Sequence, residues 1–240
     1  NRIGDLACFI AEMLGFSPDR LELVKRASSL CKTDLLTEMV GEFPKLQGIM
    51  GREYALVQGE DEEVARSIAE HYLPRFADDV LPETEIGIIL SLADKFDLIA
   101  GCFAAGLIPT GSQDPYGLRR QSQGIIRILE TKDLHLSLQK LFEKSLSNVT
   151  GICPDGDSGK VYEQIIDFFK DRINNIYIDR GYRYDIVESV MKSGFNDISD
   201  LICRLEAITK ISKTPIWQNL VAVVERTFNR SEERRVGKEC

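Results

Sequence analysis

The sequence lacks the motifs of several common functional sites. Its six cysteines include no pair at the C-x-x-C spacing of a structural zinc site, and only two histidines are present. The phosphate-binding pattern G-x-x-x-x-G-K-[ST] is absent, and no apolar run reaches transmembrane length. We therefore predict no zinc site, no nucleotide-binding P-loop, no membrane partner, and reduced thiols in a cytoplasmic protein.

Positive charge is also scarce. The chain has 30 Lys and Arg residues against 38 Asp and Glu residues, which gives a net charge of -8. A uniformly acidic protein is a poor general binder of nucleic acid, because affinity for phosphate comes from Lys and Arg. Any contact with nucleic acid would therefore need a local basic patch.

The last eleven residues, 230–240, differ from the rest of the chain. They show no apolar periodicity and resemble the in-frame translation of a sequencing-library adapter. The chain also starts at Asn1 rather than at a methionine. We expect a piece of a longer reading frame with a non-native tail, and we exclude that tail from predictions of the fold.

Apolar residues recur at intervals of three and four along most of the sequence, as is typical of amphipathic helices. Ser17 followed by Pro18 has the residue types of a helix start, and Asp61 opens another helix with acidic residues. Residues 101–114 and 148–159 are rich in turn-forming residues, so we predict a loop and a domain boundary there. A last helix is predicted over residues 217–228, and the predicted fold class is all-α.

One candidate site combines two carboxylates with an imidazole. Asp34, His71 and Asp94 fall on three different helices, at apolar or boundary positions. A buried carboxylate is costly unless it is paired or bound to a metal, so the three could form a divalent-metal phosphohydrolase site. Alternatively, each caps a helix end or meets an arginine.

A second candidate is the segment 109–120, which ends in Arg119 and Arg120. Both arginines fall in the first turns of a predicted helix, where positive charge opposes the helix dipole. That cost indicates that the arginines have partners. The partner is either a phosphate group or a carboxylate, and the candidate carboxylates are Asp94, Asp97 and Glu38.

The third candidate is a run in which aromatic and basic residues alternate. It contains Arg172, Tyr177, Arg180, Tyr182, Arg183 and Tyr184. Aromatic rings interleaved with arginine suit the unstacked bases of RNA loops. The alternative is a turn between helices in which tyrosine and arginine side chains stack on each other.

Four segments carry a family resemblance, in consistent order. They are CKTDLLTEMVGEFPKLQGIMG at 31–51, EHYLPRF at 70–76, ADKFD at 93–97, and residues 109–120. They resemble the β subunit of the bacterial heterotetrameric glycyl-tRNA synthetase, and the resemblance extends over nearly the whole chain before the tail. It implies an HD-like helical domain at 1–150, a connecting helical segment at 151–178, and a partial anticodon-binding domain at 179–229.

The resemblance also implies a division of labour between subunits. In this family the α subunit activates glycine with ATP and Mg, and the β subunit mainly binds tRNA-Gly within an α2β2 heterotetramer. We therefore expect no catalytic residue and no cofactor in this chain. The candidate tRNA-binding residues are Arg119, Arg120, Arg180, Tyr182 and Arg183, and a helical module that only docks to the α subunit is an alternative.

The HD resemblance is incomplete at the metal site. HD phosphohydrolases bind metal through a His, a His-Asp pair and a later Asp. Asp34 and Asp94 match the two aspartates and His71 could supply one histidine, but Thr33 stands where the other would be. Threonine is a poor substitute for imidazole. We expect a degenerate HD fold that binds no metal, with a metal-dependent phosphohydrolase using Asp34, His71 and Asp94 as the rival hypothesis.

Overall fold

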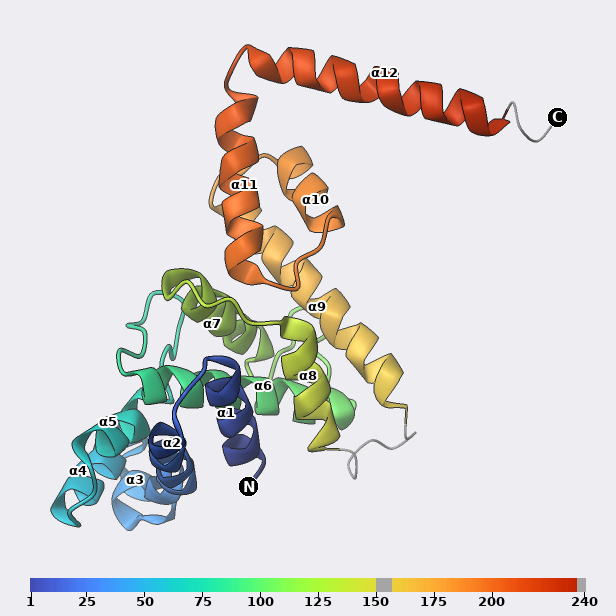
Figure 1. Cartoon of the computed structure of the whole chain (residues 1–240). Helices are drawn as coiled ribbons and strands as arrows, with labels where there is room; N and C mark the ends of the chain where they lie inside the picture. The colour runs from blue at the N-terminus through green and yellow to red at the C-terminus, as the bar shows by residue number, and fades with distance from the viewer. Residues whose placement is uncertain (150–156, 237–240) are drawn as a thin grey trace.

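The computed structural model describes residues 1–149 and 157–236, and within these ranges it consists of helices and connecting loops without strands (Figure 1). The predicted all-α fold class is confirmed. In the described helices, none is long and apolar enough to cross a bilayer. The boundary predicted at 148–159 falls largely outside the described residues, so the division into domains stays a prediction.

The first half of the chain forms short helices around a long one. In order, these are α1 (Arg2–Met13), α2 (Pro18–Leu30), the 3-10 turn η1 (Thr33–Leu36), α3 (Glu38–Glu42), η2 (Pro44–Leu46), α4 (Ile49–Val57), α5 (Glu62–Glu70) and α6 (Glu85–Ala104). The predicted helix starts are confirmed. The Ser17 hydroxyl accepts a hydrogen bond from the backbone N–H of Arg20, and the Asp61 carboxylate accepts two at the start of α5.

Helix α6 is the centre of the fold. Sixteen of its twenty residues are buried, and most of these are apolar, which is the pattern of a helix surrounded by other helices. Helices α1, α2, α5, α7, α8 and α9 all pack against it. The helix extends to Ala104, so the loop predicted to begin at residue 101 begins four residues later.

The second half continues with α7 (Leu118–Thr131), α8 (Leu138–Ser147), α9 (Ser158–Asp179), α10 (Tyr184–Lys192), α11 (Ile198–Ser212) and α12 (Ile216–Val236). One cluster of buried apolar side chains extends from Leu6 in α1 to Leu205 in α11. The hydroxyl of Ser199 in α11 donates to the carbonyl of Leu129 in α7 over 3.2 Å. These contacts join α7 to the helices that follow it.

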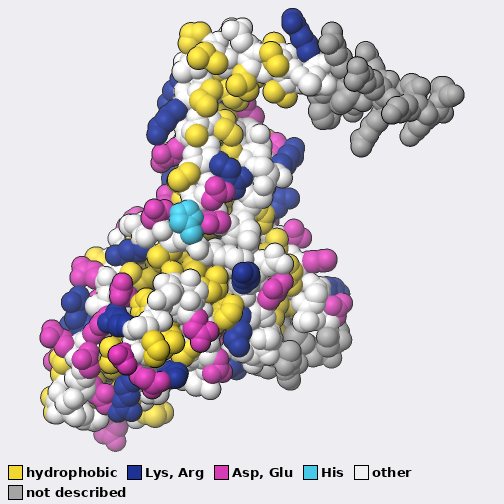
Figure 2. All heavy atoms as spheres, in the orientation of Figure 1, with side chains coloured by type: hydrophobic (Ala, Val, Ile, Leu, Met, Phe, Trp, Pro, Cys, Tyr) yellow, Lys and Arg dark blue, Asp and Glu magenta, His cyan; other side chains and the backbone are white. Residues whose placement is uncertain are grey.

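Helix α12 packs against α11 and projects away from the other helices (Figure 1). It is longer than the predicted 217–228, because Ser, Glu and Arg at 231–235 are compatible with continued helix. Ile216, Leu220 and Val223 on this helix are 64%, 46% and 62% exposed. Figure 2 shows hydrophobic side chains along α11 and α12 and again on the body below them, where acidic and basic side chains lie around them.

Candidate functional site

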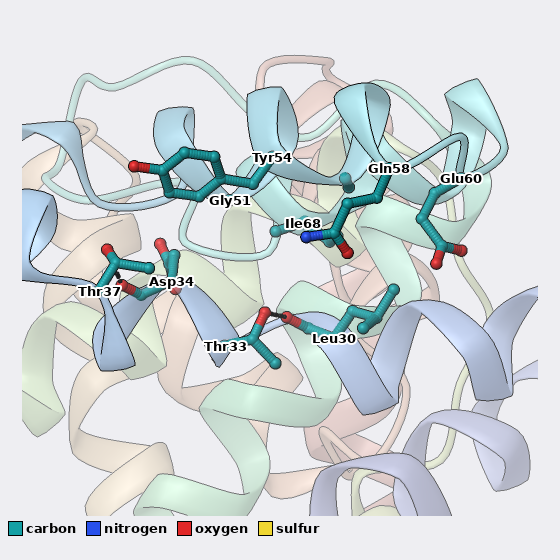
Figure 3. A pocket seen from close by; sticks show the side chains of 10 residues that line it. Leu30, Thr33, Asp34, Thr37, Gly51, Tyr54, Gln58, Glu60 and Ile68 are labelled. Atoms are coloured by element: carbon teal, nitrogen blue, oxygen red, sulfur yellow. Dashed lines mark hydrogen bonds between the residues drawn. The ribbon is translucent and has the colours of Figure 1, made fainter.

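Asp34 lies in η1 with its carboxylate buried and fully hydrogen-bonded. Its Oδ2 accepts the backbone N–H of Gly48 over 2.6 Å, and its Oδ1 accepts the hydroxyl of Tyr72 over 3.1 Å. Gly48 has a φ of +81°, and a Cβ there would come within 2.8 Å of the Tyr72 ring. Asp34 also lines a cavity of about 240 Å³, shown with its neighbours in Figure 3. The carboxylate therefore fixes the turn that leads into α4.

His71 is fully buried at the C-terminal end of α5. Its Nδ1 lies 2.6 Å from the carbonyl oxygen of Ile68. Because a carbonyl only accepts, Nδ1 carries the proton and donates. The other ring nitrogen, Nε2, has no hydrogen-bond partner among the described residues. Burial lowers the pKa of His71 to about 4, so the ring is neutral at physiological pH.

Asp94 in α6 is neutralised by a lysine. The Nζ atom of Lys32 lies 2.5 Å from the Asp94 carboxylate. The hydroxyl of Thr33 donates to the carbonyl of Leu30 over 2.8 Å. In the described parts of the chain, no three His, Cys, Asp or Glu side chains come together to hold a metal ion. Asp34 and Asp94 therefore each have a partner within the chain, and the partner of Asp94 is a lysine rather than the arginine expected under the alternative.

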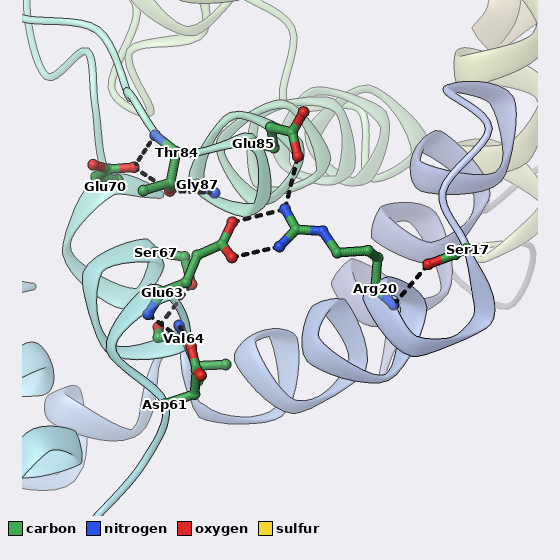
Figure 4. A network of polar contacts seen from close by, with 10 residues as sticks. All are labelled: Ser17, Arg20, Asp61, Glu63, Val64, Ser67, Glu70, Thr84, Glu85 and Gly87. Carbon is green, nitrogen blue, oxygen red and sulfur yellow. Dashed lines mark hydrogen bonds and ion pairs between the residues drawn. The ribbon is translucent and has the colours of Figure 1, made fainter.

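A network of ion pairs joins the three helices beside this cluster (Figure 4). Arg20 in α2 donates to Glu63 in α5 over 2.8 Å and to Glu85 in α6 over 2.7 Å. Glu70 at the end of α5 accepts both the backbone N–H and the hydroxyl of Thr84, over 2.9 and 2.5 Å. These contacts fix the relative positions of α2, α5 and α6.

The segment before α7 is built around Asp114. Its two carboxylate oxygens accept the backbone N–H groups of Leu118 and Arg119, over 2.8 and 2.9 Å. The Arg119 guanidinium donates to the carbonyl of Gly111 over 2.7 Å. Arg120 is exposed and lies against Gly117, where a Cβ would come within 2.8 Å of its Nη2.

Arg119 and Arg120 form no ion pair with any residue that the structure describes. Two of the carboxylates proposed as their partners are engaged elsewhere: Asp97 accepts two hydrogen bonds from Arg2, over 2.9 and 3.1 Å, and Asp94 holds Lys32. The ion-pair alternative predicted for these arginines is therefore not found.

The cluster at the end of α9 is held together mainly by its own contacts. Arg180 donates two hydrogen bonds to Glu130 in α7, over 2.7 and 2.8 Å, and lies over the Tyr177 ring at 5.2 Å. Tyr182 meets the same ring edge-on at 5.9 Å between centroids. Arg183 is exposed and pairs with Asp185 over 2.7 Å. Most of the polar groups proposed to contact RNA here thus have partners within the chain.

Three described arginines outside the candidate segments 109–120 and 172–184 also lack a carboxylate partner: Arg75, Arg127 and, in α12, Arg226. Arg127 in α7 donates to the carbonyls of Ala77 and Asp79, and Arg75 donates to the carbonyl of Gln47. Sequence reasoning restricted to residues 109–120 missed Arg127. Its spacing of seven residues from Arg120 could have revealed it, since that spacing puts both side chains on one face of a helix.

Comparison with known proteins gives one consistent result. Residues 1–192 match the family model described as glycyl-tRNA synthetase beta subunit. Relatives named glycine–tRNA ligase beta subunit come from Desulforamulus reducens, 47% identical over 95% of this chain and 33% of the relative, and from Clostridioides difficile, 46% identical over 95% and 32%. Geotalea uraniireducens has another, 45% identical over 95% and 33%. The chain spans about a third of the length of these relatives.

Proposed function

Because the chain belongs to the glycyl-tRNA synthetase beta-subunit family, we propose that it is part of the β subunit of a glycine–tRNA ligase. That enzyme would charge tRNA-Gly with glycine at the expense of ATP in the cytoplasm. The adenylation site, with its ATP and Mg, would be on a partner α subunit in an α2β2 assembly. The role of this part of the chain would be to bind tRNA without catalysing a step.

The state of Arg119 and Arg120 is the observation that best supports tRNA binding. Positive charge in the first turn of a helix opposes its dipole and costs about 0.3–1 kcal/mol per charge. Neither arginine recovers that cost through a carboxylate among the described residues, and the nearby Asp114 is bound to backbone N–H groups. Arg120 is exposed, and Arg119 is half-exposed with one hydrogen bond to the carbonyl of Gly111. Guanidinium groups without a carboxylate partner are suited to phosphate oxygens.

Binding of tRNA can be tested with fluorescently labelled tRNA-Gly and anisotropy. We expect the 240-residue chain to bind, with an affinity that falls as salt rises, because binding to phosphates releases counterions. Combined Arg119→Ala and Arg120→Ala substitutions should weaken binding about tenfold or more. Arg52→Ala is a matched control, because Arg52 is half-exposed and paired with Glu53. Absence of binding at about 50 mM salt would refute the proposal.

The non-catalytic role needs a separate measurement. The purified chain alone should not exchange pyrophosphate into ATP in the presence of glycine, and it should bind no Mn²⁺ in a calorimetric titration. Adenylation by the isolated chain would place the chemistry here and contradict the proposal. Mn²⁺-dependent phosphatase activity would instead support the phosphohydrolase hypothesis.

A further inference from the structure

Carboxylate pairing separates the arginines of this chain into two groups. Among the described side chains, eight arginines form ion pairs: Arg2, Arg20, Arg26, Arg52, Arg66, Arg180, Arg183 and Arg204. Six described arginines form none. Two of them are Arg172 in α9 and Arg226 in α12, and the other four, Arg75, Arg119, Arg120 and Arg127, lie on α7 or on the loop beside it. In an acidic protein carboxylates are abundant, so a local group of unpaired arginines calls for a specific explanation.

The loop at 74–80 is fixed against the middle of α7. Arg127 donates to the carbonyls of Ala77 and Asp79, the latter over 3.1 Å. Gly124 of α7 lies so close to Pro74 that a Cβ there would be 3.3 Å from the proline ring. The residues that precede and follow Phe76 are therefore held in place beside α7.

Helical geometry puts Arg120 and Arg127 on the same side of α7, with Gln123 between them. Seven residues at about 1.5 Å per residue separate the two arginines by about 10 Å along the helix axis. Arg120 is exposed, and Gln123 and Arg127 are half-buried. The result is a strip of hydrogen-bond donors along α7 rather than a single point charge.

Two exposed aromatic rings accompany this strip. Phe76 in the loop is 58% exposed and Tyr116, just before α7, is 47% exposed. The carboxylate of Asp79 accepts the backbone N–H groups of Arg75 and Val80, over 2.6 and 2.9 Å. Asp78 adds a second, exposed carboxylate to the same loop, so the four guanidinium groups outnumber the two carboxylates of that loop.

We propose that this α7 surface, formed by Arg75, Phe76, Tyr116, Arg119, Arg120 and Arg127, binds a single-stranded segment of RNA. The proposal rests on the proposed function and names the part of the RNA that this surface takes. The arginines contact phosphates, and the bases stack on Phe76 and Tyr116. Only unstacked bases offer a free face to a ring, so a continuous duplex is excluded as the ligand.

The experiment uses the 240-residue chain and two labelled probes, a single-stranded RNA of mixed sequence and the same sequence annealed to its complement. We expect the single strand to bind at least tenfold more tightly than the duplex. Phe76→Leu keeps an apolar side chain but removes the ring, and it should weaken single-strand binding about tenfold, since stacking contributes roughly 1–3 kcal/mol per base. Phe76→Tyr keeps the ring and should retain binding.

Charge variants test the strip itself. Arg120→Ala should weaken binding of the single strand and reduce the slope of the salt dependence by about 0.7. Lys192→Ala is the matched control, because Lys192 is exposed and paired with Glu188 on α10. Circular dichroism of each variant shows that its fold is retained.

The outcomes separate the two proposals. If the unmodified chain fails to bind tRNA-Gly, the proposed function fails. If it binds tRNA-Gly but Phe76→Leu and Arg120→Ala leave binding unchanged, or if it prefers the duplex, the α7 surface is refuted and the proposed function stands.

Discussion

Burial of His71 should make the stability of the fold depend on pH between 7 and 4. The folded protein lowers the pKa of this imidazole from 6.5 to about 4, chiefly because the ring is removed from water. In the unfolded chain His71 takes up a proton as the pH falls through about 6.5, whereas the folded chain resists protonation until about pH 4. Stability present above pH 6.5 is therefore lost as the solution is acidified.

The size of this loss follows from the two pKa values. One pKa unit corresponds to about 1.36 kcal/mol, so the full loss by pH 4 is roughly 3 kcal/mol. Integration between pH 7 and pH 5 gives about 2 kcal/mol. His135 acts in the opposite direction, because its hydrogen bond to Asp197 raises its pKa in the folded state. A comparison between variants that both keep His135 cancels that contribution.

The assay is urea denaturation of the original chain and of His71→Gln at pH 7, 6 and 5. The glutamine amide can still donate to the Ile68 carbonyl but cannot titrate. We expect the free energy of unfolding of the original chain to fall by about 2 kcal/mol more than that of His71→Gln between pH 7 and pH 5. Parallel decreases in the two proteins would show that the folded state does not exclude the proton from His71.

Three other substitutions test the packing and the ion pairs, each by denaturation at pH 7. Lys95 is buried, donates to a carbonyl and a hydroxyl, and contacts no carboxylate among the described residues. Because a buried charge without a counter-charge is costly, Lys95→Met should stabilise the fold by about 1–2 kcal/mol. A loss of stability would contradict this. Gly87→Ala should destabilise it by about 1–3 kcal/mol, because the new methyl group would lie 2.2 Å from the Glu70 carboxylate. Gly101→Ala, in open space on the same helix, should instead stabilise it by about 0.5–1 kcal/mol; equal effects of the two alanines would refute the steric argument. Arg180→Ala removes a half-exposed ion pair with α7. Because solvent screens such a pair, the free energy of unfolding should fall by about 1 kcal/mol or less, and a larger fall would contradict this.

Local rules predict the helices well where cap chemistry and periodicity agree, as at Ser17 and Asp61. They fail at Gly101, where a glycine in a turn-rich stretch indicated a loop. Glycine in the interior of a helix costs only about 1 kcal/mol, and the burial of α6 against its neighbours outweighs that cost. Tertiary packing of this kind is not visible in a window of ten residues.

The candidate sites also depend on tertiary contacts that the sequence does not reveal. The residue types that could carry chemistry were identified, but their partners were not. Glu130 holds Arg180 from 50 positions away, and Lys32 holds Asp94 from a different helix. Such pairs depend on how helices cross, so the sequence could not decide between an internal partner and a ligand for any of these groups. Arg119 and Arg120 could be separated from Arg180 only after the fold was known.

An acidic chain can therefore be consistent with RNA binding. Net charge counts every arginine equally, yet eight of the described arginines form ion pairs with carboxylates of the same chain. The four arginines on and beside α7 have no carboxylate partner, so their positive charge is available to a phosphate group. If each neutralises one phosphate of a single strand, the slope of log affinity against log salt should be about -3, since each contact contributes about -0.7. A slope much steeper than this would mean that RNA also displaces the internal ion pairs, and that the α7 surface is only part of the interface.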